Sequence, residues 1–249
     1  MHILRRLFCA AAVAALPVTQ ALAQPPAAPP PPPGWTGSFG AGLAVTQGNS
    51  DTSTFNLAYD VKHDSGSPVL FKSTALFLRG SSAGELIARR LLLDARVDRK
   101  LTARTSVYGQ AQYMNDEFKQ IDYLISPTAG VAQALVRTAT IELNADAGAG
   151  VVTEKNPGAE ARTSGAITAG ENYRHKITAT AEITQRVAAL WKTDDFDDAL
   201  YVFGAGLAAN VSARTQFKGE LLDTCKNRPP SVLVRKNDVA VLLSFVYKY

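Results

Sequence analysis

The last thirteen residues of the chain, Asn237–Tyr249, alternate strictly between two kinds of position. One set is wholly apolar and ends in tyrosines: Val239, Val241, Leu243, Phe245, Tyr247 and Tyr249. A period of two is that of a β-strand, and the length is enough for a tilted strand to cross a bilayer. The segment therefore predicts a strand with one face toward lipid. A core strand of a soluble β-sandwich is the alternative that the other segments have to exclude.

The same alternation, broken by turn residues, recurs along the chain. No apolar run after residue 35 approaches the roughly 18 residues that a membrane helix needs, so a membrane-spanning form has to be a closed barrel. Short connections alternate with mostly longer ones, as in transmembrane barrels. We therefore predict an all-β, antiparallel up-and-down transmembrane β-barrel over residues 35–249, with about twelve strands, although ten or fourteen are possible. The expected strands are Trp35–Thr46, Thr52–Lys62, Val69–Arg79, Ile87–Arg99, Ala103–Tyr113, Ile121–Val131, Ile141–Val151, Thr163–Tyr173, Ile177–Trp191, Tyr201–Val211, Thr215–Asp223 and Asn237–Tyr249.

The start of the chain has a different composition. Arg5 and Arg6 precede the apolar run Leu7–Val18 and the small-residue site Ala21–Ala23. This is the pattern of a cleaved secretory signal peptide, predicted over residues 1–23. Residues 24–34 are mostly proline and alanine and predict a spacer. Removing the two arginines from the 26 basic residues leaves 24 against 22 acidic ones, which gives no reason to expect nucleic acid as a partner.

The polar faces of the predicted strands carry charges of both signs. Arginine on the lipid face costs roughly 2–4 kcal/mol near the bilayer midplane, so these faces should point into the lumen. The charges either pair and fill the lumen or line a narrow water-filled path. Twelve strands lie between the filled barrels of eight and the open ones of sixteen, so size does not decide. The residues that we expect to line the lumen are Lys62, Arg90, Asp94, Arg96, Asp146, Glu182 and Arg186.

The aromatic last residue, with apolar residues at alternate positions before it, is similar to the assembly signal of bacterial outer-membrane barrels. We expect Phe245, Tyr247 and Tyr249 to serve as that signal. The expected partners are the barrel-assembly machinery, outer-membrane lipid and lipopolysaccharide. The oligomeric state stays open.

Several short stretches, taken in order and with their spacing, resemble one family, the salt-induced outer-membrane proteins of domain-of-unknown-function family 481. The matching pieces are Thr46–Thr52, Asp98–Leu101, Asn115–Phe118, Ile121–Tyr123 and Asn237–Asp238. Leu124 stands where the resemblance leads us to expect an arginine, and Thr128 where a glycine is usual. The resemblance implies an outer-membrane barrel of a Gram-negative envelope and supplies no activity.

Residues suited to chemistry are few. Outside the predicted signal peptide the histidines are His63 and His175, both at short turns and on the wrong side for an outer-membrane phospholipase, so we expect no enzyme. Neither has a partner at metal-ligand spacing, and we expect no metal or cofactor. The acidic segment Asp194–Asp198 is expected to be a solvated outer loop, with a cation site as the alternative. The basic segment Lys226–Lys236 is expected to be an exposed loop that could meet lipid phosphates.

Two functions remain from the sequence. The first is a structural barrel or narrow, porin-like passive pore for small ions and solutes. The second is an envelope-stress or surface-binding barrel that acts through its outer loops without transport.

Overall fold

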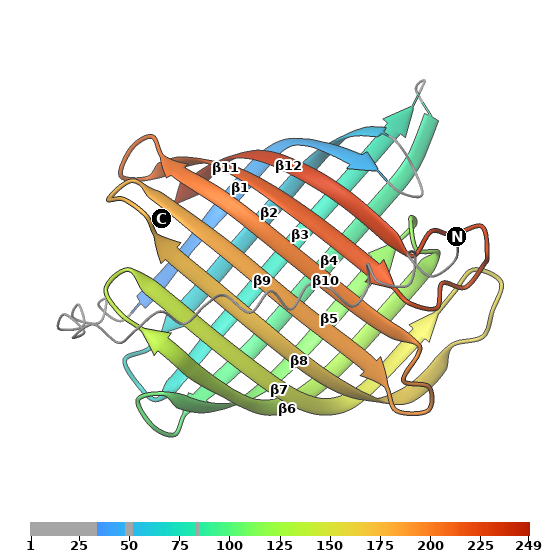
Figure 1. The fold of residues 1–249 in the computed structure, drawn as a ribbon, viewed down its shortest axis with the longest axis horizontal. Coiled ribbons are helices and arrows are strands. Elements are labelled where there is room, and N and C mark those ends of the chain that lie inside the picture. Colours follow the sequence, from blue (N-terminus) through green and yellow to red (C-terminus); the bar gives the residue numbers. More distant parts are fainter. Residues whose placement is uncertain (1–33, 48–51, 83–84) are drawn as a thin grey trace, which may run out of the picture.

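The computed structural model describes residues 34–47, 52–82 and 85–249. The predicted signal peptide and most of the proline-rich spacer lie outside these residues. Twelve antiparallel strands form a closed barrel in which each strand pairs with its sequence neighbours and β1 pairs with β12 (Figure 1). This confirms the predicted fold class. The strands are β1 (Gly34–Gln47), β2 (Thr52–Asp64), β3 (Val69–Ser82), β4 (Glu85–Lys100), β5 (Thr105–Asp116), β6 (Ile121–Arg137), β7 (Ile141–Lys155), β8 (Arg162–Lys176), β9 (Ala181–Lys192), β10 (Ala199–Asn210), β11 (Thr215–Lys226) and β12 (Asn237–Lys248).

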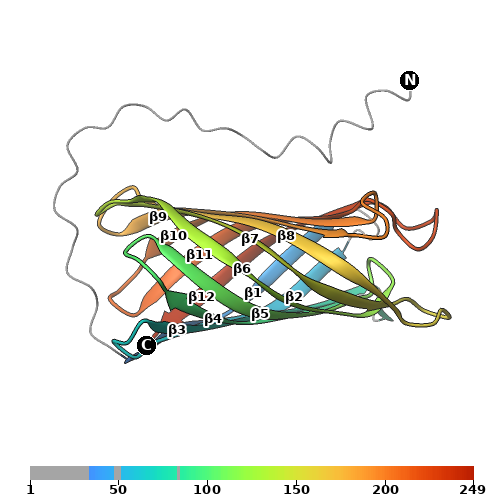
Figure 2. The ribbon, with the colours of Figure 1, turned by 90° about the horizontal axis from the view of Figure 1, so that it is seen from below.

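The connections divide the barrel into two ends. The segments β7–β8, β9–β10 and β11–β12 are longer than the others and lie at one end, which we call the long-loop end (Figure 2). The opposite end, the short-turn end, carries both the start of β1 and the end of β12. The prediction of mostly longer connections at the long-loop end is only half right. The other connections there span only residues 48–51, 83–84 and 117–120, and the one at 83–84 is shorter than expected because β3 and β4 continue further than predicted.

One predicted strand begins too early. The sequence places its start at Ile177, whereas β9 begins at Ala181. The Thr178 hydroxyl accepts the backbone N–H groups of Thr180 and Ala181 at 3.1 and 2.9 Å. This side-chain hydrogen bonding forms a turn that competes with the strand ladder.

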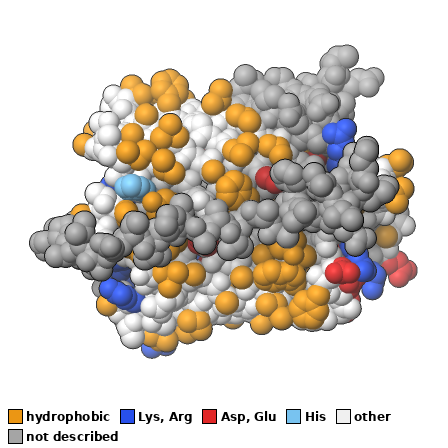
Figure 3. All heavy atoms as spheres, viewed as in Figure 1, with side chains coloured by type: hydrophobic (Ala, Val, Ile, Leu, Met, Phe, Trp, Pro, Cys, Tyr) orange, Lys and Arg blue, Asp and Glu red, His pale blue; other side chains and the backbone are white. Residues whose placement is uncertain are grey.

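The outer wall is apolar between two polar ends. Exposed hydrophobic side chains occupy alternate positions along the strands, such as Leu93 and Val97 on β4 or Val241, Leu243 and Phe245 on β12. Figure 3 shows hydrophobic side chains over the middle of one face and charged groups gathered toward the ends. Aromatic side chains lie near both ends: Trp35 stacks on His63 at the short-turn end, and Trp191 donates to the Tyr201 hydroxyl at the long-loop end. Within the described residues, no helix is long and apolar enough to cross a membrane.

Candidate functional site: the closed end of the lumen

A layer of apolar side chains crosses the lumen toward the long-loop end. Leu78 of β3 packs in one cluster with Leu222 of β11 and with Ala240 and Leu242 of β12. Because β2 and β1 separate β3 from β12, these contacts pass through the barrel interior. We call the following residues the apolar ring: Leu76, Leu78, Leu92, Met114, Ile121, Leu124, Val152, Ala166, Leu190, Leu200, Val202, Leu222, Ala240 and Leu242.

The ring is continuous over β3 to β12. Its two clusters meet at Leu76 and Leu92, which are cross-strand partners of β3 and β4, and again on β10, which contributes Leu200 and Val202. Leu124, where the family resemblance led us to expect an arginine, is 3% exposed inside this ring. An apolar constriction of this kind excludes ions by excluding water.

A second layer, made of buried charges, lies beside the ring at the long-loop end. The Arg90 Nε atom of β4 is 2.6 Å from the Asp116 Oδ2 atom of β5, and the side chains are only 2% and 0% exposed. Arg90 also donates to the Thr224 hydroxyl of β11 at 3.3 Å, on the far side of the lumen. Its guanidinium lies 5.4 Å from the centre of the Phe118 ring. Arg90 therefore spans the lumen instead of lining an open path.

The β5–β6 connection, residues 117–120, folds into the mouth of the barrel. Asp116 shapes it by accepting the backbone N–H groups of Phe118 and Lys119 at 2.9 and 3.2 Å. Lys119, whose side chain is 0% exposed, reaches the Asp238 carboxylate at 3.0 Å and donates to the carbonyl oxygens of Arg235 and Lys236 at 3.2 and 2.6 Å. All three ammonium donors are thus used. Burial lowers the pKa of Lys119, and the Asp238 carboxylate opposes that shift.

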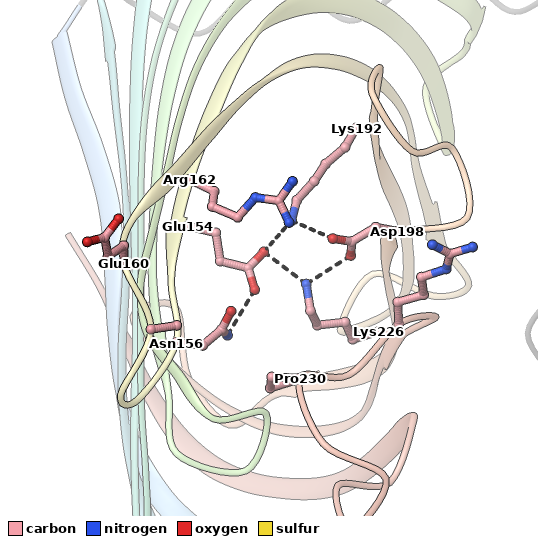
Figure 4. Close-up of a pocket in the computed structure, with 10 residues that line it drawn as sticks. Glu154, Asn156, Glu160, Arg162, Lys192, Asp198, Lys226 and Pro230 are labelled. Atoms are coloured by element: carbon pink, nitrogen blue, oxygen red, sulfur yellow. Dashed lines mark hydrogen bonds and ion pairs between the residues drawn. The ribbon is translucent and has the colours of Figure 1, made fainter.

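Four more charges complete the layer on the other side of the mouth (Figure 4). Glu154 Oε2 lies 2.9 Å from both Lys192 Nζ and Lys226 Nζ, and the two ammonium groups contact Asp198 at 2.6 and 3.1 Å. The Asn156 amide donates to the second oxygen of Glu154 at 3.1 Å. A pocket of about 140 Å³ lies over this quartet, with Arg162, Arg228 and Pro230 on its walls. The quartet is neutral and internally paired, so it ties β7, β9 and β11 together across the mouth.

The short-turn half of the lumen carries more exposed side chains, such as Asp60 and Arg186, beside a charged group on one wall. Arg96 lies 3.7 Å from the centre of the Tyr108 ring and 3.5 Å from Asp146, and Tyr108 donates to Asp146 at 3.3 Å. A Cβ at Gly130 would lie 2.2 Å from the Ala147 carbonyl oxygen and one at Gly148 2.5 Å from the Tyr108 hydroxyl, so glycine at both positions lets this ring lie against β6 and β7. The Tyr108 side chain, Arg96 and Asp146 therefore lie together against one wall of the barrel.

The predicted lumen residues fall into three groups. Arg90 belongs to the buried charge layer, whereas Arg96, Asp146 and Asp94 (the last accepting a hydrogen bond from Gln110) lie in the short-turn half. Arg186 of β9 is exposed and within electrostatic range of Asp60 on β2, across the lumen. Lys62 shares the face of Asp60, and Glu182 that of Arg186. The three predicted residues of this last group, Lys62, Glu182 and Arg186, do not join the buried charges in one cluster.

Sequence reasoning missed most of the buried charge layer: Asp116, Lys119, Glu154, Lys192, Lys226 and Asp238. Strand alternation could have found several of them, since Glu154 continues the inward face of Asp146. The segment after Asn115 reads as a charged surface loop, and no local pattern shows that Lys119 is buried. Lys226 was expected in an exposed loop near lipid phosphates, but its side chain is 3% exposed because it pairs with Glu154.

The predicted assembly residues lie on the outer wall at the closure of the barrel. Phe245 and Tyr247 of β12 are 46% and 43% exposed, and Phe245 makes an edge contact with Phe217 of β11. Tyr249 and Gly37 exchange backbone hydrogen bonds of 3.2 and 3.1 Å.

The other candidate groups are the two histidines and the acidic loop, and each of them contacts neighbouring side chains. His63 stacks on Trp35 and His175 contacts Tyr173, and neither has a hydroxyl or carboxylate partner among the described residues. The acidic loop pairs with residues of other elements. Asp194 accepts from Ser164, which lowers its pKa, and Arg228 holds both Asp195 and Asp197. Within the described part of the chain, no group of three or more potential metal ligands is present.

Several known structures with the same fold are outer-membrane porins and channels. The chain is similar to a structure titled "NanC porin structure in rhombohedral crystal form" (TM-score 0.58, 6% identity, covering 85% of this chain and 100% of that one). It is also similar to an outer membrane channel, COG4313, from Pseudomonas putida F1 (TM-score 0.53, 13% identity, 88% and 97% covered) and to the KdgM porin (TM-score 0.52, 8% identity, 85% and 99% covered). At such identities the likeness concerns the fold alone.

No curated protein matches the sequence. A family model does match it, over residues 39–249 and hence most of the barrel. The chain therefore belongs to the family described as "Protein of unknown function, DUF481".

Proposed function

We propose that this protein is a channel-type barrel of the bacterial outer membrane whose lumen is closed at rest near the long-loop end. Small ions pass only weakly, and selectivity by sign is low because the lumen carries charges of both signs. The apolar outer wall with aromatic residues near both ends supports the membrane location, as does the predicted signal peptide. The observation that carries the proposal is the apolar ring beside the buried charge layer.

The two layers close the lumen for different physical reasons. The apolar ring gives a hydrated ion nothing to replace its water shell. The charge layer holds its own groups in pairs, and removing one partner of a buried pair costs about 3–5 kcal/mol because the other charge is stranded. The apolar ring is therefore the main barrier to ions, because it offers no polar group to water, whereas the paired charges can still be hydrated as an ion passes.

Conductance across a planar lipid bilayer tests the proposal. The refolded parent protein should give very low current at neutral pH. The double variant Leu78→Ser/Leu222→Ser places hydroxyl groups in the ring and should raise the current by about tenfold or more, since a wet constriction no longer repels ions.

A matched control changes two inward residues outside the ring, Asn144→Ser and Thr184→Ser, and should conduct like the parent. A parent protein with a large, steady, open current would contradict the proposal. So would a ring variant that folds and inserts but conducts no better than the parent.

The alternative, action through the outer loops without transport, is favoured by one observation. The β9–β10 and β11–β12 connections are bound to each other, because Arg228 contacts Asp195 and Asp197 and the Asn227 amide donates to the Asp197 carbonyl at 2.9 Å. If neither the parent nor the ring variant conducts, while Arg228→Gln changes a cell-surface phenotype, this second function replaces the first.

A further inference from the structure

Two arginines face each other on the outer wall at the long-loop end. Arg79 of β3 and Arg89 of β4 are cross-strand partners, and both are exposed. Directly opposed residues of an antiparallel pair project from the same face, and like charges there are destabilising. Arg89 contacts Glu117 at 3.2 Å, whereas Arg79 has no ion pair among the side chains that the structure describes. An anion from outside the chain that binds both Arg79 and Arg89 therefore relieves the repulsion between the two guanidinium groups.

The height of this pair on the barrel follows from β4. Its outward face runs from Arg89 through Leu91, Leu93 and Val97 to Arg99. Arg89 and Arg99 are ten positions apart on β4. Ten residues of strand span about 34 Å, and a tilt of roughly 40° reduces this to about 26 Å across the membrane. That matches the apolar band of about 25 Å in outer-membrane barrels, so Arg89 and Arg79 lie at the headgroup level of one leaflet.

The neighbours of the pair suit an amphiphile. Phe55 of β2, which is 48% exposed, is the cross-strand partner of Arg79 on its other side. Leu91 and Phe77 form the next outward row toward the middle of the barrel. The Arg89–Glu117 pair is half exposed, and such surface pairs contribute little, so Arg89 can exchange Glu117 for a stronger anion.

We propose that Arg79 and Arg89 bind the phosphate monoester of a glycolipid in the leaflet around the long-loop end. A monoester presents three oxygens and nearly two negative charges, enough to accept hydrogen bonds from two guanidinium groups at once. The acyl chains of the same lipid then lie along Phe77 and Leu91. This inference rests on the proposed membrane location.

Native mass spectrometry of the refolded full-length protein in detergent, with bisphosphorylated or dephosphorylated lipid A as the probe, tests the site. The parent should retain the phosphorylated form about tenfold better. The variant Arg79→Gln/Arg89→Gln should lose that preference, a change of about 1.4 kcal/mol in binding. Glu117→Gln should strengthen binding, because it removes the competing carboxylate.

The matched control Arg99→Gln/Arg104→Gln removes two positive charges at the short-turn end and should bind like the parent. Equal binding of both lipid A forms by the parent, or unchanged binding by Arg79→Gln/Arg89→Gln, would overturn the inference. Insertion of the parent into vesicles is measured in parallel. Without insertion the membrane proposal itself fails, whereas insertion without phosphate preference rejects only the lipid site.

Discussion

At the scale of single residues, the closure of the barrel depends on a glycine covered by an aromatic ring. A Cβ at Gly37 would lie 2.7 Å from both the Tyr249 hydroxyl and the Asp60 carbonyl oxygen. Tyr249 therefore lies over Gly37, an arrangement in which an aromatic residue covers the backbone that a glycine leaves bare. The sequence identified Tyr249 as important through its terminal position, but the glycine partner follows only from the register of β1 and β12.

We predict that Gly37→Ala weakens this closure. The new methyl group has to displace the Tyr249 ring, at a cost of about 1–3 kcal/mol. Urea unfolding in detergent, followed by the gel shift between unheated and boiled samples, measures the loss. Gly109→Ala is the control, since its Cβ would meet nothing within 4 Å and should leave the stability unchanged or slightly raised. Equal destabilisation by both substitutions would contradict the account.

The Arg90–Asp116 pair gives a second prediction at this scale. Asp116→Asn leaves a buried guanidinium without its counter-charge and should lower the free energy of unfolding by about 3–5 kcal/mol. The double variant Arg90→Met/Asp116→Asn removes both charges, keeps a side-chain oxygen at position 116 that can accept from the 117–120 backbone, and should lose clearly less. A double-mutant cycle from denaturant unfolding measures the difference. If the losses of the two single variants add up to the loss of the double variant, the two residues are not coupled in the barrel interior.

At the scale of elements, strand alternation predicted the strands well and the connections poorly. The period of two is enforced by water or lipid on one face and the lumen on the other, so it can be read from local sequence for β12 or β4. The connection at 117–120 obeys no such rule. Its charges look solvated in sequence, and their burial depends on Asp238 and Arg90, which lie far away in the chain.

Adjacent positions on β12 test which face meets lipid. Phe245→Asp places a carboxylate on the outer wall and should lower the amount of protein in the outer-membrane fraction. Ser244→Asp points the same charge into the lumen and should be tolerated far better. Quantitative blotting of membrane fractions compares the two. Similar levels for both variants would mean that Phe245 does not meet lipid.

At the scale of the whole molecule, the sequence predicted a barrel with charges inside but left open whether its lumen is closed. The reason is that closure is a property of opposite walls. Leu78 and Leu222 occupy ordinary inward positions, and only the diameter and stagger of the closed barrel bring β3 and β11 close enough to join one cluster. The same holds for Glu154, Lys192 and Lys226, which come from three strands.

The most direct test of the closed lumen is sided labelling of cysteines in intact cells with a membrane-impermeant maleimide, in a Cys225→Ser background. Arg186→Cys, on the short-turn side of the apolar ring, should stay unlabelled until the outer membrane is permeabilised. Val232→Cys, fully exposed in the β11–β12 connection, should be labelled at once. Adding Leu78→Ser/Leu222→Ser should expose position 186 to the outside. Labelling of Arg186→Cys in intact cells as fast as Val232→Cys, with the ring unchanged, would contradict the closed lumen.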